Sequence, residues 1–240
     1  MRQRILTAEL MDDPGLDPAE HGRALMGLRR LNTLSNAAGP VRGALVPMLR
    51  GAGVEHARAR LLDVATGGGD LLLALGRAGF GTGTGRLVGV DVSATALGIA
   101  RQNGERLGIA AEWVLADVLA GGLPVEDGGV DVAVCSLFLH HLDEAGVVRV
   151  LAEMRRVSRV GVVVSDLRRS RVGLALAAAV SRVVTRSRVV HVDAVKSVRS
   201  AWCGDELAAL AARAGLGGAR VRGVWPARLL LVWAGQGART

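Results

Sequence analysis

The sequence predicts an α/β fold: a doubly wound, mostly parallel sheet of seven strands, arranged as in Rossmann-like domains. Three observations lead to this. From residue 61 onward, short Val- and Leu-rich runs alternate with amphipathic segments, the pattern of parallel strands joined by crossover helices. Three consecutive glycines, Gly67, Gly68 and Gly69, follow the first run. Half of the 240 residues are apolar, which is enough for a sizeable core.

Residues 1–50 are expected to form a helical cap in front of this sheet. The stretch Asp17–Glu20 reads DPAE, which marks a helix start because Asp caps helices and Pro is favoured in the first turn. Leucines then recur at helical spacing over residues 21–35. A second helix is expected over 41–49 and should bend at Pro47.

Residues 51–240 are expected to form one domain of alternating elements. Strands are predicted at 61–65, 86–91, 112–116, 130–135, 160–165, 219–224 and 228–234. Helices are predicted near 70–78, 94–107, 143–157, 172–185 and 205–214. Only residues 225–227 separate the last two strands, which is too short for a parallel crossover, so they should form an antiparallel hairpin at one end of the sheet.

Composition narrows the classes of function. The net charge of +8 points to nucleic acid or an anionic membrane. However, Lys196 is the single lysine, and the arginines are scattered without the aromatic neighbours that base stacking needs, so no specific nucleic acid partner is expected. Cys135 and Cys203 lie far apart, which fits a reducing cytoplasm. The apolar run Val172–Val180 is too short to span a membrane.

The stretch LLDVATGGGD (61–70) sets the glycine triplet between an expected strand and an expected helix. This is the edge at which doubly wound sheets bind ligands, and glycine allows both a tight turn and close approach to the backbone. A dinucleotide fingerprint would need glycine at Leu72, and a phosphate loop would need a nearby lysine. Asp63 and Asp70 flank the triplet and would repel a pyrophosphate, so they favour a ligand with positive charge and hydroxyls.

Two further carboxylates follow later strands. Asp91 ends the second strand, where it can accept hydrogen bonds from both hydroxyls of a ribose. Asp117 follows the third strand and is placed to accept from an adenine amino group. A single acid at the end of a strand is often only a helix cap, and Asp91, which lies before Ser93, could have that role alone. In this order, after a glycine turn, they describe an adenine nucleoside with a cation and no phosphates: S-adenosylmethionine.

These motifs resemble those of class I S-adenosylmethionine-dependent methyltransferases, especially the small-molecule enzymes of ubiquinone and menaquinone biosynthesis. The likeness covers about residues 55–166 and is carried by DVATGGGD (63–70), LVGVD (87–91), LADV (115–118) and VDVAVCSLFLHHLDE (130–144). Thr66 stands where the family usually has its first loop glycine. The cofactor contacts implied are Asp63, Thr66, Gly67, Gly68, Gly69, Asp70, Asp91, Val92, Asp117, Val118, Ser136 and Leu137.

The segment SLFLHHLDE follows the fourth strand, at the edge where the transferred methyl group should lie. His140 or His141 is expected to be the general base, because imidazole titrates near pH ~6.5. Consecutive side chains diverge, so one of the two should act while the other caps or packs against the next helix. Asp166 ends the fifth strand and can orient an imidazole or bind an acceptor hydroxyl. His191 is a third candidate base.

The segment 167–203 is expected to form the lid over the acceptor, as the insert after the fifth strand commonly does in this fold. It is apolar and cationic together, which suits an apolar acceptor such as a phenolate or quinol; an ordinary surface helix with solvated arginines is the alternative. The segment is also similar to the lids of actinobacterial methyltransferases that act on phenolic, polyketide-derived lipids.

The expected activity is O-methylation of a small phenolic, quinol or polyketide-type molecule, with no metal ion. Methylation at carbon of a quinol ring stays open, because it uses the same cofactor pocket. An RNA methyltransferase is disfavoured, since CSLF (135–138) replaces the Asn/Asp-Pro-Pro-Tyr/Phe motif of enzymes that methylate nucleobases. A homodimer is compatible with the sequence.

Overall fold

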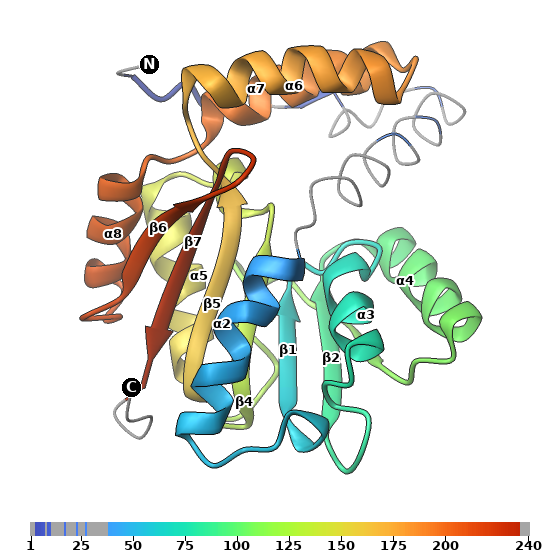
Figure 1. Cartoon of the computed structure of the whole chain (residues 1–240), viewed down its shortest axis with the longest axis vertical. Coiled ribbons are helices and arrows are strands. Elements are labelled where there is room, and N and C mark those ends of the chain that lie inside the picture. The colour runs from blue at the N-terminus through green and yellow to red at the C-terminus, as the bar shows by residue number, and fades with distance from the viewer. Residues whose placement is uncertain are drawn as a thin grey trace.

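The computed structural model describes residues 3–7, 9–10, 17, 23, 27 and 38–235. The helix expected after Asp17 lies mostly outside the described residues; Arg23 and Gly27 are described, and both are helical. A seven-stranded sheet with the order β3-β2-β1-β4-β5-β7-β6 forms the centre of the molecule (Figure 1). The predicted α/β class, with a doubly wound and mostly parallel sheet, is therefore confirmed.

The first five strands run parallel, and β7 enters antiparallel between β5 and β6. The strands are β1 (Arg60–Val64), β2 (Arg86–Asp91), β3 (Glu112–Leu115), β4 (Val130–Ser136), β5 (Ser158–Leu167), β6 (Arg220–Val224) and β7 (Arg228–Ala234). The strand order reverses between β1 and β4, and an open α/β sheet binds its ligand at the carboxyl ends beside such a reversal. The closing hairpin, β6 and β7, is confirmed as antiparallel.

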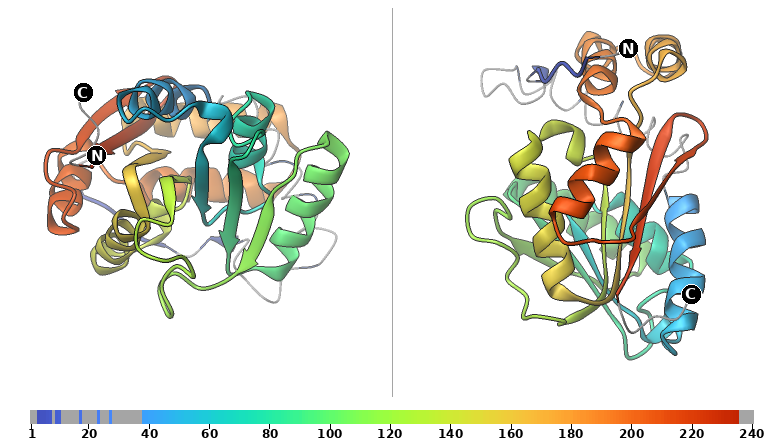
Figure 2. Two further views of the ribbon diagram at one scale, coloured as in Figure 1. Left: turned by 90° about the horizontal axis from the view of Figure 1, so that it is seen from below. Right: turned by 90° about the vertical axis from the view of Figure 1, so that its left-hand side faces the viewer.

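Helices cover both faces of the sheet (Figure 2, right view). They are α2 (Ala38–Gly51), α3 (Asp70–Arg77) and α4 (Ala94–Leu107) on one face, and α5 (Glu144–Val157) and α8 (Gly204–Arg213) on the other. Successive residues of a strand point to opposite faces. Leu61 thus packs with α2 and α3, while its neighbour Leu62 packs with α5 and α8.

Two further helices, α6 (Arg171–Val184) and α7 (Arg188–Ser200), pack against each other above the carboxyl ends of the parallel strands (Figures 1 and 2). Each begins at a serine cap: Ser170 Oγ accepts from the Gly173 amide, and Ser187 Oγ from the Val190 amide. The sequence predicted α6 but no separate helix at α7. Its five valines have low intrinsic helix propensity, and packing on α6 outweighs that preference.

The helix α2 extends beyond the predicted range 41–49, continues through Pro47 and packs against the sheet as part of the core. The division of the chain at residue 50 stays a prediction. Among the described residues, no helix combines the length and apolar character needed to cross a bilayer. The cytoplasmic location also stays a prediction.

Substitution of Gly161 should test how closely α2 and β7 pack on β5. A Cβ at Gly161 would collide with the carbonyl oxygen of Trp233 and lie 2.7 Å from Met48 Sδ. Gly161→Ala should therefore lower the free energy of unfolding by about 1–3 kcal/mol in urea titrations. Gly98→Ala is the control, because its added Cβ meets no atom within 4 Å and alanine favours a helix by up to about 1 kcal/mol. Equal stability of the two variants would contradict the packing.

Candidate functional site

The glycine turn joins β1 to α3, and its glycines are needed for different reasons. Gly67 and Gly69 both have left-handed backbone angles, φ of 55° and 78°. A Cβ on Gly67 would meet open space, whereas one on Gly69 would lie 2.7 Å from the ring of Trp113. Gly69 is therefore required both for its left-handed φ and for packing on Trp113, whereas at Gly67 the left-handed φ alone favours glycine. Cofactor contacts of Gly67, Gly68 and Gly69 stay predictions.

The carboxylate of Asp91 connects this turn to the end of β2. Its Oδ2 accepts from the Gly67 amide at 2.8 Å, and its Oδ1 accepts from the Ser93 amide at 2.9 Å. Ser93 itself caps α4, with Oγ accepting from the Ala96 amide. Because each carboxylate oxygen can accept two hydrogen bonds, Asp91 supports the local fold and can still receive ribose hydroxyls.

Asp63 and Thr66 lie beneath the turn. The Thr66 hydroxyl donates to Asp63 Oδ2 at 2.7 Å, and both side chains are buried. Burial raises the pKa of the Asp63 carboxyl to about 7, although the Thr66 hydrogen bond opposes the rise. Thr66, which stands where the resembled family usually has glycine, thus gives Asp63 a hydrogen-bond partner inside the protein. Asp70, at the first position of α3, is exposed.

The remaining predicted cofactor residues lie at the same edge of the sheet. Val92 follows β2 and is 68% exposed, and Asp117 is exposed with Oδ1 accepting from the Leu119 amide at 2.8 Å. Val118 is buried in the core on the α5 side. The Ala116 amide donates to the Asp91 carbonyl at 3.0 Å, so the ends of β2 and β3 are joined there.

Backbone strain marks both sides of the strand-order reversal. Ala65, directly after β1, and Leu137, directly after β4, are non-glycine residues with φ of 55° and 56°. Ser136, the last residue of β4, precedes Leu137, whose amide donates to the Ser165 carbonyl at 3.0 Å. Strained residues of this kind cluster at functional sites because the surrounding structure has to hold them.

His140 and Asp166 form a buried pair between the ends of β4 and β5. His140 lies in the short helix η3 (Leu139–His141), and its Nδ1 is 2.6 Å from Asp166 Oδ1. The His140 amide also donates to Asp166 Oδ2, at 3.1 Å. The exposed fractions are 4% for His140 and 2% for Asp166. Because Asp166 holds the hydrogen on Nδ1, the other ring nitrogen, Nε2, is left to accept a proton.

Each partner changes the acidity of the other. Burial alone would lower the pKa of His140, but the charge and hydrogen bond of Asp166 outweigh it, and the pKa of His140 rises above 6.5. Burial would likewise raise the pKa of Asp166, but the imidazolium outweighs it and holds that pKa below 3.8. The pair therefore stores a proton on His140 in mildly acidic solution and releases it as the pH rises.

His141 does not diverge from His140 as the sequence predicts, and the centroids of the two rings lie 4.2 Å apart. The His141 side chain is 33% exposed, and its Nδ1 lies 3.9 Å from Glu9 Oε1. The same Glu9 oxygen lies 3.9 Å from His140 Nε2. His191 is occupied away from this pair, with Nε2 at 2.7 Å from the Thr185 carbonyl, where it ties the turn between α6 and α7.

Sequence reasoning missed the N-terminal strap, which we define as residues 3–7 and 9–10. Arg4 donates to the carbonyls of His140, at 3.0 Å, and Leu142, at 2.6 Å, and its guanidinium lies 3.6 Å from the ring centroid of Trp202. Glu9 accepts from the Ser197 hydroxyl of α7. These partners are more than 130 residues away along the chain, so no local sequence pattern could predict the contacts.

Glu9, His140 and His141 offer three ligand atoms within 4.8 Å of one another, a grouping that can hold a metal ion. The two imidazole rings are stacked, however, with centroids 4.2 Å apart and planes 35° apart. The expected absence of metal stays a prediction.

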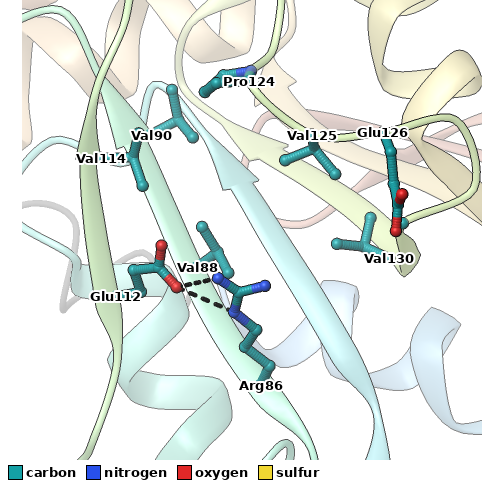
Figure 3. Close-up of a pocket in the computed structure, with 10 residues that line it drawn as sticks. Arg86, Val88, Val90, Glu112, Val114, Pro124, Val125, Glu126 and Val130 are labelled. Carbon is teal, nitrogen blue, oxygen red and sulfur yellow. Dashed lines mark hydrogen bonds and ion pairs between the residues drawn. The ribbon is translucent and has the colours of Figure 1, made fainter.

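A separate hollow of about 330 Å³ lies along β2 and β3 (Figure 3). Alternate strand residues, including Val88 and Val114, form its floor, and the Arg86–Glu112 ion pair lies at one end. It exists because the connection 116–129 contains turns and no helix, which leaves this face partly uncovered. None of the predicted site residues lines it.

Comparison with known proteins agrees with this geometry. Residues 61–161 match the methyltransferase domain family. A demethylmenaquinone methyltransferase of Thermus thermophilus is 36% identical over 104 residues, which are 43% of this chain and 44% of the relative. The chain thus spans less than half of the curated relative that it matches.

Two solved structures share the fold at low identity. An S-adenosylmethionine-dependent methyltransferase of Aquifex aeolicus superposes with a TM-score of 0.60 at 18% identity, covering 91% of this chain and 98% of that one. A plantazolicin methyltransferase, solved with S-adenosylhomocysteine, gives 0.65 at 15% identity and covers 90% of each chain. Residues 61–161 therefore match the methyltransferase domain family, and the chain shares its fold with solved S-adenosylmethionine-dependent methyltransferases.

Titration of the His140 ring by NMR should measure the pairing with Asp166. In the wild type, we expect a pKa above 6.5. In Asp166→Asn, burial remains while the negative charge is lost, so the pKa of His140 should fall below the wild-type value. Asp131→Asn removes a buried carboxylate from the other end of β4 and should leave the titration unchanged. An identical His140 pKa in wild type and Asp166→Asn would contradict the assignment.

Proposed function

We propose that this chain, which contains a methyltransferase domain at residues 61–161, transfers a methyl group from S-adenosylmethionine to a hydroxyl of a small apolar acceptor of the phenol or quinol type. One observation carries the proposal: the buried His140–Asp166 pair lies between the ends of β4 and β5, beside the strand-order reversal at which Asp91 holds the glycine turn. A proton acceptor and a nucleoside site thus share one edge of the sheet.

The residues at this edge fit the cofactor. Asp91 has spare acceptor capacity for the ribose hydroxyls, and Gly67 leaves open space at the turn. Asp117 is exposed at the end of β3, where it can accept from the adenine amino group. When bound, the cofactor supplies a methyl group already activated by the positive sulfonium. The protein has to hold the acceptor in line with that group and exclude water.

His140 supplies the base. Asp166 fixes the ring with hydrogen on Nδ1, and Nε2 would accept the proton of the acceptor hydroxyl while its oxygen takes the methyl group. The sulfur–methyl bond would break in the same step, with S-adenosylhomocysteine as the leaving group. The positive charge that develops on the imidazole lies against the Asp166 carboxylate, which stabilises it. A base positioned in this way typically contributes ~10²–10⁴-fold to the rate. Since the base must be neutral, turnover should rise with pH through the raised pKa of His140.

Methylation at carbon of a quinol ring is the second candidate. The likeness of residues in the matched segment to a demethylmenaquinone methyltransferase favours a quinone-type acceptor. The same base can deprotonate the ring hydroxyl, after which the electron-rich ring carbon would take the methyl group as the sulfur–methyl bond breaks. The methylated carbon would then lose its hydrogen as a proton to solvent while His140 returns its proton to the ring oxygen, which restores the aromatic ring. NMR of the methylated product separates the two candidates, because a methoxy group and a ring methyl resonate at different shifts.

Replacement of Asp91 tests the cofactor site. Asp91→Ala should weaken S-adenosylmethionine binding about tenfold to a hundredfold in calorimetry, since a lost hydrogen-bonded carboxylate costs about 1.5–3 kcal/mol. Asp205→Ala, at an exposed acid of α8, should bind like the wild type. If Asp91→Ala is folded, as judged by its melting curve, and binds as tightly as the wild type, the ribose assignment is wrong.

Replacement of the histidines tests the base. With phenols and quinols as acceptors, His140→Ala should lower kcat by ~10²-fold or more while the affinity for S-adenosylmethionine stays nearly constant. His141→Ala is the matched control and should lose far less, because Asp166 holds the buried ring of His140 whereas the His141 side chain is 33% exposed. Near-wild-type turnover of both His140→Ala and Asp166→Asn across neutral pH would show that the enzyme works without this base.

A further inference from the structure

The helix α6 turns a row of apolar side chains to solvent. Val172, Val180 and Val183 are 59%, 37% and 87% exposed. Positions 172, 176, 179, 180 and 183 recur at a spacing of three or four residues, so they share one face of the helix. Within α6, only Gly173 and Ser181 are buried. An apolar row of this size on a helix surface is typical of a site that contacts a partner or a membrane.

The charge around this row has one sign. Residues 167–192 contain six arginines and no aspartate or glutamate. Arg169 is buried and paired with Glu206. The other five are exposed: Arg168, Arg171, Arg182, Arg186 and Arg188. Arg171 and Arg182 each precede an exposed valine by one residue, so both border the apolar row on the same side. A helix with apolar and cationic faces is the pattern that lies in the interface of an anionic membrane.

Two other occupants fit less well. A second copy of the chain would bring two rows of arginines against each other, and like charges at a contact oppose association. Nucleic acid would use the arginines but would gain nothing from valines, and residues 167–192 contain no Phe, Trp or Tyr for base stacking. An anionic lipid surface uses both features, since its phosphates attract arginine and its acyl boundary accepts valine.

We propose that α6 docks the protein on an anionic lipid bilayer, with the valine row at the acyl boundary and the arginines on lipid phosphates. The lid formed by α6 and α7 lies at one end of the molecule, above the carboxyl ends of β1, β4 and β5 (Figures 1 and 2). The candidate site would then open near the membrane surface, where an apolar acceptor partitions. The supply of an apolar acceptor from the membrane rests on the proposed function, but the docking itself does not.

Vesicle sedimentation of the full chain, without cofactor or acceptor, tests the docking. Vesicles of phosphatidylcholine mixed with phosphatidylglycerol should bind the protein at least about tenfold more tightly than phosphatidylcholine alone. The variant with Val172→Glu and Val183→Glu should lose about tenfold or more of this binding. A triple variant with Arg171→Gln, Arg182→Gln and Arg186→Gln should lose about a hundredfold, at roughly fivefold for each arginine near the surface.

Matched controls place the same changes on other exposed residues. Val46→Glu with Leu107→Glu alters exposed apolar residues of α2 and α4. Arg42→Gln, Arg50→Gln and Arg77→Gln remove three exposed arginines of α2 and α3. Both controls should stay within about twofold of wild type.

Three results would overturn the proposal. The first is no binding to anionic vesicles at low salt, and the second is an equal loss of vesicle binding in the arginine control. The third is a wild-type dimer that dissociates when Val172 and Val183 are changed, together with no binding to vesicles. The assay needs no turnover, so the two proposals can fail separately. A protein that docks but has no methyltransferase activity would overturn only the proposed function. A protein that is active but does not dock would overturn only this inference.

Discussion

The burial of one carboxylate organises the candidate active edge of this protein. Asp166 is 2% exposed at the end of β5, and an unpaired charge at such a position would be very costly. It is compensated by the His140 ring and amide and by the Leu167 amide, at 2.6, 3.1 and 2.6 Å. Removing one member of a buried ionic pair typically costs about 3–5 kcal/mol. The compensation of the buried charge on Asp166 therefore fixes the position of His140.

The turn that carries His140 is held from distant parts of the chain. Trp202 Nε1, next to the lid, donates to the Leu139 carbonyl at 2.8 Å. Arg4 of the N-terminal strap donates to the carbonyls on either side of His141 and stacks on Trp202. The strap is tied to α7 in turn, with the Ile5 amide donating to the Arg199 carbonyl. Movement of α7 or of the strap would consequently act on His140 through backbone hydrogen bonds.

The strands, their alternation with helices and the closing hairpin were predictable because they depend on local patterns. Valine and leucine runs, Ser and Asp caps and the short connection at 225–227 all act within a few residues, and the strand boundaries agree to within two residues. The choice between His140 and His141 was not predictable, because it depends on which side chain of η3 turns toward β5. The contacts of Glu9 and Arg4 were not predictable either, because their partners lie more than 130 residues away along the chain. The tight turn predicted at Gly69 is confirmed by its φ of 78°, whereas the added constraint from the ring of Trp113 comes from tertiary packing.

Two buried carboxylates at the same edge illustrate how the partner decides the chemistry. Asp63 and Asp166 are both 2% exposed, so desolvation acts on them alike. The partner of Asp63 is the neutral hydroxyl of Thr66, which cannot offset burial, and its pKa rises to about 7. The partner of Asp166 is an imidazole that can become charged, and its pKa falls. Near neutral pH, Asp63 can therefore carry its own proton and act as a support beneath the glycine turn. Asp166 stays ionised and raises the pKa of His140, so the two carboxylates differ in charge although both are buried.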